Sequence, residues 1–193
     1  MEDTWVKNQG RQGMRIKKEL SAGLLIDVQE KLFPHMDQKE ELLRRTTILL
    51  EGLKVLQVPM VITEQYPKGL GPTLRPLSLL LDNEAVLEKI SFSCCGEASF
   101  SDKLKSLERP TIILCGIEAH VCVLQTVVDL LEEGYTVVVI EDCISSRNPV
   151  DKGVAVERMR SEGAIISTCE SILFELAVVA GTEEFKAISR LVK

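Results

Sequence analysis

Two hydrophobic patterns alternate along this chain. Six short, continuous apolar runs are typical of buried strands, and the segments between them repeat apolar residues at helical spacing. The predicted strands span residues 24–28, 59–63, 85–88, 111–115, 135–140 and 164–168. The predicted helices span residues 39–57, 99–107, 121–133, 150–162, 171–180 and 183–192. This alternation predicts an α/β fold, in which helices cover both faces of a parallel sheet.

The same pattern predicts one domain. Residues 1–19 mix acidic, basic, glycine and glutamine residues, and we expect a flexible lead-in there. Residues 20–193 contain no repeat or linker and are long enough to bury one sizeable core. Residues 64–73 hold two prolines and two glycines, which predicts a loop.

Composition and charge restrict the possible partners and the cellular compartment. Hydrophobic content of 45% and charged content of 27% are typical of a soluble globular protein. A net charge of −6 without a basic block argues against nucleic-acid binding. No apolar run is long enough to cross a membrane, and the first residues lack the apolar core of a signal peptide. Six cysteines without metal-type spacing fit a reducing compartment, so we expect a cytoplasmic protein.

Cys122 occupies an informative position. It follows the apolar run 111–115, which Gly116 is expected to interrupt, and it falls at the start of the predicted helix 121–133. The positive end of a helix dipole and its free N–H groups favour a thiolate and could also bind an oxyanion. The alternative is a buried cysteine that acts as a small hydrophobe. That is the interpretation for the other five, which are Cys94, Cys95, Cys115, Cys143 and Cys169.

Two further polar residues lie at the carboxyl ends of predicted strands. Asp27 lies near the end of the first strand, and Lys89 ends the third. Open parallel sheets bind ligands beyond this edge, so Asp27, Lys89 and Cys122 are candidates for one site. Asp27 could instead cap a helix, and Lys89 could be a solvated strand end. The apolar residues before Asp27 favour a buried carboxylate, which requires a partner.

At this point the chain resembles the isochorismatase-like cysteine hydrolases. The resemblance is carried by residues 24–29 with Phe33, Lys89 with residues 92–93, and residues 116–123, 142–147 and 168–174. Residues 63–71 further resemble the isochorismatase domain-containing subgroup. The resemblance implies a Rossmann-like three-layer fold with a six-stranded sheet of order 3-2-1-4-5-6. It also implies a catalytic triad of Asp27, Lys89 and Cys122.

The resemblance and the chemistry of these side chains suggest their roles. Asp27 would take the thiol proton and later activate water. Lys89 would hold Asp27 as a carboxylate and lower the thiol pKa. Cys122 would attack a carbonyl to give a thioester. The family pattern also implies a cis peptide at Ile117–Glu118, which would direct the amides of Glu118 and Cys122 into an oxyanion hole. The substrate pocket would be lined by Phe33, Gln65, Tyr66, Phe92 and His120.

Departures from the family pattern refine the expected activity. The chain has only two histidines, His35 and His120, so the Asp–His–His metal cluster of nicotinamidases has no counterpart, and we expect no metal and no cofactor. True isochorismatases do not require the cysteine, so the complete triad favours hydrolysis of a small amide, imide or ureido substrate. The alternatives are vinyl-ether hydrolysis and a non-catalytic interaction protein. For His120, lining of the pocket and a direct catalytic role both remain open.

We also expect a homo-oligomer. The family resemblance suggests this, and the C-terminal helices carry more apolar residues than one buried stripe needs. These residues are Leu173, Phe174, Leu176, Val178 and Val179.

Overall fold

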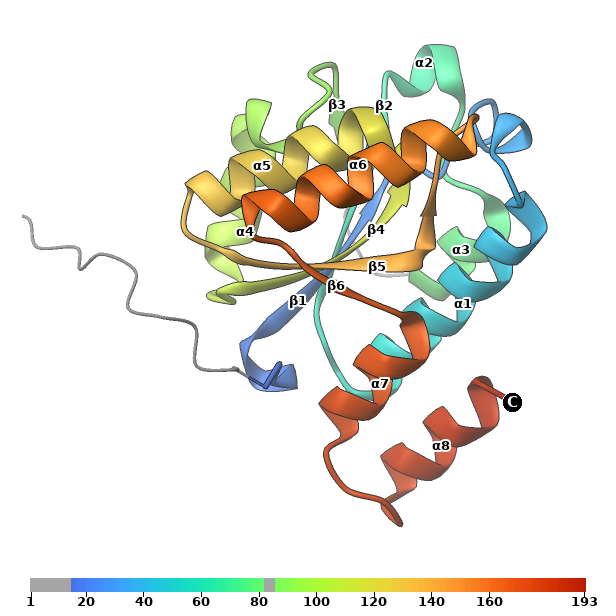
Figure 1. Cartoon of the computed structure of the whole chain (residues 1–193), viewed down its shortest axis with the longest axis vertical. Coiled ribbons are helices and arrows are strands. Elements are labelled where there is room, and N and C mark those ends of the chain that lie inside the picture. The colour runs from blue at the N-terminus through green and yellow to red at the C-terminus, as the bar shows by residue number, and fades with distance from the viewer. Residues whose placement is uncertain (1–14, 82–85) are drawn as a thin grey trace, which may run out of the picture.

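A six-stranded parallel sheet forms the centre of the molecule (Figure 1). The computed structural model describes residues 15–81 and 86–193. The strands are β1 (Ser21–Ile26), β2 (Met60–Gln65), β3 (Val86–Lys89), β4 (Thr111–Ile117), β5 (Thr136–Ser145) and β6 (Ile165–Ser167). Their order is β3-β2-β1-β4-β5-β6, so the predicted topology is confirmed. The predicted residue 85 of the third strand lies outside the described residues.

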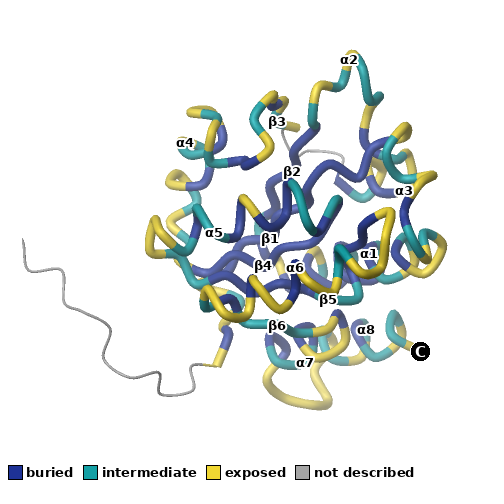
Figure 2. The backbone as a smooth tube through the Cα atoms, turned by 45° about the horizontal axis from the view of Figure 1, so that its top comes forward, coloured by how far each residue is buried: buried dark blue, intermediate teal, exposed yellow. Residues whose placement is uncertain are grey.

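Helices cover both faces of the sheet, which gives three layers (Figure 1). They are α1 (Lys39–Val55), α2 (Pro67–Leu70), α3 (Arg75–Ser78), α4 (Ala98–Ser106), α5 (Leu124–Glu132), α6 (Pro149–Glu162), α7 (Cys169–Ala177) and α8 (Glu183–Leu191). One core lies between the sheet and α1, α3, α7 and α8. The other lies between the sheet and α4, α5 and α6. The central strands β1 and β4 are buried on both faces (Figure 2), as continuous apolar strands require.

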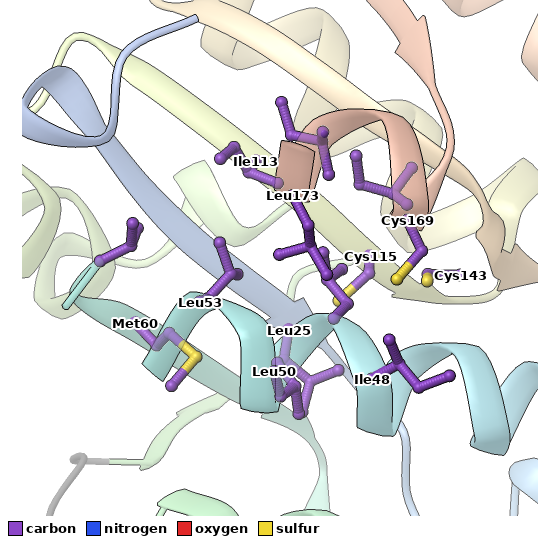
Figure 3. Packing of buried hydrophobic residues seen from close by; sticks show 14 of the residues in the cluster. Leu25, Ile48, Leu50, Leu53, Met60, Ile113, Cys115, Cys143, Cys169 and Leu173 are labelled. Atoms are coloured by element: carbon purple, nitrogen blue, oxygen red, sulfur yellow. The ribbon is translucent and has the colours of Figure 1, made fainter. Parts of the chain in front are cut away.

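Close packing on the first face depends on a glycine of α1. A side chain at Gly52 would place its Cβ 2.4 Å from Leu173 Cδ2, so the glycine lets α7 lie directly against α1. Figure 3 shows Leu173 inserted between α7 and α1, beside Leu50 and Leu53. Leu173 is fully buried, and burial of such a side chain stabilises the fold by about 1.5–3 kcal/mol.

The first described residues pack against the C-terminal helices, which bury most of their predicted surplus of apolar residues. Leu173 and Leu176 are buried, and the ring of Phe174 packs 5.8 Å from that of Phe185. Only Val178 and Val179 of the five C-terminal apolar residues are strongly exposed. Residues 16–20 belong to this assembly, because the Ile16 amide donates to Glu175 and Lys18 pairs with Glu184. The packed body therefore begins inside the segment predicted to be a lead-in.

The predicted break at Gly116 is wrong. β4 continues through this residue to Ile117, and Gly116 adopts a φ of 132°, which favours glycine. A Cβ there would lie 2.1 Å from the carbonyl oxygen of Ile26. The glycine thus permits close contact between β4 and the end of β1, just before Asp27.

Two other boundaries differ from the prediction. The segment 64–73 is not entirely a loop, because β2 extends to Gln65 and α2 forms one short turn. The helix after β4 starts with a π-helical segment, Ala119–Val123, labelled η5, before α5 begins. Cys122 lies within this π-helical segment rather than in the first turn of an α-helix. Such segments are rare and occur often at functional sites.

Candidate active site

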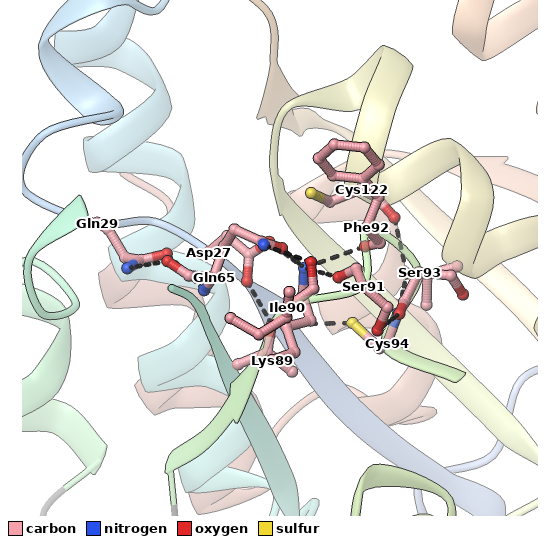
Figure 4. Close-up of polar contacts among 12 residues, drawn as sticks. Asp27, Gln29, Gln65, Lys89, Ile90, Ser91, Phe92, Ser93, Cys94 and Cys122 are labelled. Carbon is pink, nitrogen blue, oxygen red and sulfur yellow. Dashed lines mark hydrogen bonds and ion pairs between the residues drawn. The ribbon is translucent and has the colours of Figure 1, made fainter. Parts of the chain in front are cut away.

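The three predicted triad residues meet at the carboxyl edge of the sheet (Figure 4). Asp27 directly follows β1, Lys89 ends β3, and Cys122 follows β4 in the π-helical segment. Lys89 Nζ lies 2.7 Å from Asp27 Oδ2, and the two side chains are only 2% and 0% exposed. Cys122 is buried and its thiol interacts with both. Three strand ends therefore place a thiol, a carboxylate and an ammonium group together.

The backbone around Asp27 positions its carboxylate. Asp27 has a φ of 53°, a left-handed conformation that aspartate tolerates better than most residues. Its amide donates to the carbonyl of Thr63 at 3.2 Å, and its Oδ1 accepts from the Thr63 hydroxyl at 2.8 Å. Its Oδ2 faces Lys89 as an ion pair and has no well-aligned hydrogen bond from the described residues. The Lys89 ammonium group is thus the charged partner of this oxygen.

Lys89 is held by several oxygen atoms besides Asp27. Its Nζ lies 2.7 Å from Gln65 Oε1, 3.0 Å from the carbonyl of Phe92 and 3.2 Å from the carbonyl of Ser91. Burial opposes its charge, but the Asp27 carboxylate acts in the opposite direction, and the pKa of Lys89 is raised above its usual value. Lys89 is therefore a cation paired with the Asp27 side chain.

The expectation of a resting Cys122 thiolate is wrong. Burial and the charge of Asp27 raise the pKa of the Cys122 thiol to about 12, although Lys89 acts in the opposite direction, as predicted. Burial is a tertiary effect, and here it exceeds the local influence of the helix terminus. The resting site holds a protonated thiol, and a nucleophilic sulfur requires transfer of the proton to a base.

The predicted cis peptide at Ile117–Glu118 is confirmed. The Glu118 carboxylate accepts from the backbone and side-chain nitrogens of Arg147 at 3.0 Å and 3.1 Å, and these contacts link the β4 end to the β5 end. His120 also contacts the segment after β5, because its Nδ1 lies 2.9 Å from the Ser146 hydroxyl. His120 and Ser146 therefore connect the π-helical segment to the neighbouring strand.

The predicted pocket residues divide into two groups. Tyr66 and Phe92 are 52% and 55% exposed. Phe33 is partly buried and packs against the core. The amide of Gln65 is engaged within the protein, because it accepts from Lys89 and donates to the carbonyl of Ile90 at 2.7 Å. Gln65 thus lies beside Lys89 and orients it.

Sequence reasoning missed the polar residues that support the triad. Gln29 is buried and donates to the carbonyls of Gln65 and Gly71, which fixes the segment after β2. Thr63 and Cys94 lie behind Asp27. Buried threonine and glutamine side chains need partners, but these partners lie on distant segments and leave no signal in the sequence pattern.

The described residues contain no cluster of three or more His, Cys, Asp or Glu side chains that could hold a metal ion. In the same part of the chain, no helix is long and apolar enough to span a membrane. All six cysteines are free thiols.

Comparisons with known proteins find similar chains and a similar fold. The isochorismatase domain family model matches residues 21–171. The secreted isochorismatase effector Isc1 of Phytophthora sojae is 38% identical over 183 residues, which cover 93% of this chain and 87% of that protein. Isochorismatase domain-containing protein 2 of Danio rerio is 39% identical over 178 residues, with 92% and 89% covered. The structure of the MAR1 ribonuclease from Caenorhabditis elegans matches with a TM-score of 0.88 at 38% identity, over 93% of this chain and 92% of that one.

Proposed function

This chain belongs to the isochorismatase family, and from that premise we propose that it is a metal-independent cysteine hydrolase of a small amide, imide or ureido compound. One observation carries the proposal. A thiol, a carboxylate and an ammonium group, all buried, meet where three parallel strands end. Isolated buried charges are costly, and this pair adjoins a potential nucleophile.

Acylation begins with proton transfer from the Cys122 sulfur to Asp27. The sulfur then forms a bond to the substrate carbonyl carbon, and the C–N electron pair moves onto nitrogen. Asp27 returns its proton to that nitrogen, so the amine leaves neutral and a thioester remains on Cys122. The amides of Glu118 and Cys122 would stabilise the carbonyl oxygen as it becomes negative.

Deacylation repeats these steps with water. Asp27 accepts a proton from the water molecule as its oxygen attacks the thioester carbonyl. The C–S bond breaks, the proton on Asp27 returns to the sulfur, and the acid product leaves. Lys89 stays protonated throughout and stabilises the carboxylate between proton transfers.

The surroundings support a small substrate that is at least partly apolar. Tyr66, Ile90 and Phe92 are strongly exposed on the segments after β2 and β3 and could contact it. The name of the Caenorhabditis elegans neighbour indicates ribonuclease activity for that protein, but the present site does not favour a polyanion. Lys89 is neutralised by Asp27, Arg147 pairs with Glu118, and the net charge is −6.

Vinyl-ether hydrolysis is the second candidate, because relatives carry the name isochorismatase. In that reaction the enzyme would protonate the substrate without a covalent sulfur intermediate. A non-catalytic interaction protein on the same fold is the third candidate. The buried ion pair beside a thiol argues against it, because a scaffold gains nothing from that arrangement.

We further infer a homo-oligomer in a reducing, cytoplasmic setting. Exposed apolar side chains remain on α6, at Val150 and Val154, and after β3, at Ile90 and Phe92. Six free cysteines without a disulfide suit a reducing compartment. Light scattering at micromolar concentration tests the assembly, and a monomeric mass would refute it.

An activity screen over small amides, imides, ureido compounds and vinyl ethers tests the function. Wild type should hydrolyse at least one C–N substrate, and Cys122→Ala should abolish that turnover while keeping the fold. Cys95→Ala is the matched control, since Cys95 is half-buried and is not part of the triad. Turnover of a vinyl ether by Cys122→Ala would replace the proposed mechanism with ether hydrolysis.

A further inference from the structure

A buried chain of hydrogen-bond donors leads from Cys94 through Thr63 to Asp27. The Cys94 thiol lies 3.8 Å from Thr63 Oγ1 and donates to it, and the Thr63 hydroxyl donates to Asp27 Oδ1 at 2.8 Å. Cys94 is 0% and Thr63 1% exposed, so bulk water does not compete for these contacts. Nothing in the proposed reaction uses either side chain directly.

The direction of this chain is determined by its members. A hydroxyl has one proton, and an ionised carboxylate only accepts, so the proton of Thr63 must point to Asp27. The thiol of Cys94 keeps its own proton, because burial and the charge of Asp27 raise its pKa to about 11. Each donor polarises the next, which strengthens the final bond to the carboxylate.

The same segment is also tied to the nucleophile. The Cys94 amide donates to Thr126 Oγ1 at 3.0 Å, and the Thr126 hydroxyl donates to the carbonyl of Cys122 at 2.7 Å. Ser93 is bonded to Asp129 of α5 through its hydroxyl. These hydrogen bonds therefore hold the segment that carries Cys94 in place relative to both Cys122 and Asp27.

We propose that Thr63, supported by Cys94, is a positioning residue that holds Asp27 with Oδ2 toward Lys89 and Cys122 and restrains its affinity for the thiol proton. This inference rests on the proposed function. Without the Thr63 donor, Oδ1 would be a buried acceptor without a partner, and the carboxylate would bind protons more tightly. The titratable groups that face Asp27 are Lys89 from β3, Cys94 from η4 (Cys94–Gly96) and Cys122 from the π-helical segment.

The test measures the rate of Cys122 alkylation by iodoacetamide between pH 4 and pH 9, by mass spectrometry of each cysteine peptide. In wild type, the Cys122 rate should fall toward acidic pH, which gives an acidic limb. Thr63→Val keeps the side-chain shape and removes the hydroxyl. We expect its acidic limb to move to higher pH and the rate at pH 6 to fall about 10-fold or more. Thr63→Ser restores the donor and should return the limb toward wild type.

The Cys94 variants provide a second test if Thr63→Val does not fold. Cys94→Ala removes the outer donor and should move the acidic limb to higher pH, by less than Thr63→Val does. Cys94→Ser keeps a donor and should move the limb less than Cys94→Ala. A merely structural role would lower the melting temperature and leave the limb in place. That result, in either pair of variants, would overturn the inference. If wild type showed no acidic limb or no preference for Cys122, the proposed function itself would fail.

Discussion

Removal of the Lys89 ammonium should destabilise this protein far more than removal of an exposed cation. Lys89→Met leaves the Asp27 carboxylate buried without its partner, at a site where both side chains are almost completely buried. Loss of one member of a buried ion pair typically costs about 3–5 kcal/mol. Gln65 Oε1 and the carbonyl of Phe92 also lose a donor. At roughly 2–4 °C per kcal/mol for a domain of this size, the melting temperature should fall by about 6–20 °C.

A second ion pair with the same separation between its charged atoms provides a matched control. Lys18 and Glu184 are also 2.7 Å apart, but their side chains are 29% and 38% exposed, and solvent screens such pairs. Lys18→Met should therefore cost about 0–1 kcal/mol. Urea titration at pH 7 measures both free energies of unfolding. The double variant Lys89→Met/Asp27→Asn should recover part of the loss, because the stranded charge is gone. A cost for Lys89→Met within about 1 kcal/mol of the control would refute the reasoning.

Three further predictions concern pH, packing and metal. A thiol in the unfolded chain has a pKa near 9, whereas folding raises the pKa of Cys94 to about 11 and that of Cys122 to about 12. The free energy of unfolding should therefore be fully present below pH 9 and should fall as the pH rises toward 11. Urea titrations should show this loss at up to about 1.4 kcal/mol per pH unit per thiol, and flat stability would contradict it. Gly116→Ala forces a Cβ against the carbonyl of Ile26 and should lower the free energy of unfolding by about 1–3 kcal/mol, which thermal melts can measure. The same substitution should also abolish most of the turnover. Chelator should leave hydrolase activity unchanged, and loss with EDTA reversed by zinc would exclude the metal-free mechanism.

The parallel sheet and the shared edge of Asp27, Lys89 and Cys122 were predictable from short-range patterns, whereas the strand order was predicted from the resemblance to a known family. Continuous apolar runs identify buried parallel strands, and strand ends in such a sheet share one edge. Asp27 and Lys89 are polar residues at two of these ends, and Cys122 begins the helix after a third. Their contact therefore follows from topology.

The remaining features depend on contacts between distant segments. The pKa of Cys122 is set by burial and by Asp27, which no local pattern reveals. In the sequence Gly116 resembles a strand breaker, and its actual role, close contact with the carbonyl of Ile26, depends on a distant segment. Thr63 has the same sequence signature as any strand threonine, and only its distance to Asp27 distinguishes it.

The central claim is that Cys122 becomes covalently acylated. Once the screen provides a C–N substrate, rapid acid quench followed by peptide mass spectrometry measures this directly. Wild type should carry the acyl mass on the peptide that contains Cys122, and hydroxylamine should release it as a hydroxamate. Cys122→Ala should show neither the adduct nor turnover. Undiminished turnover by Cys122→Ala, or an acyl group on another residue, would contradict the proposed mechanism.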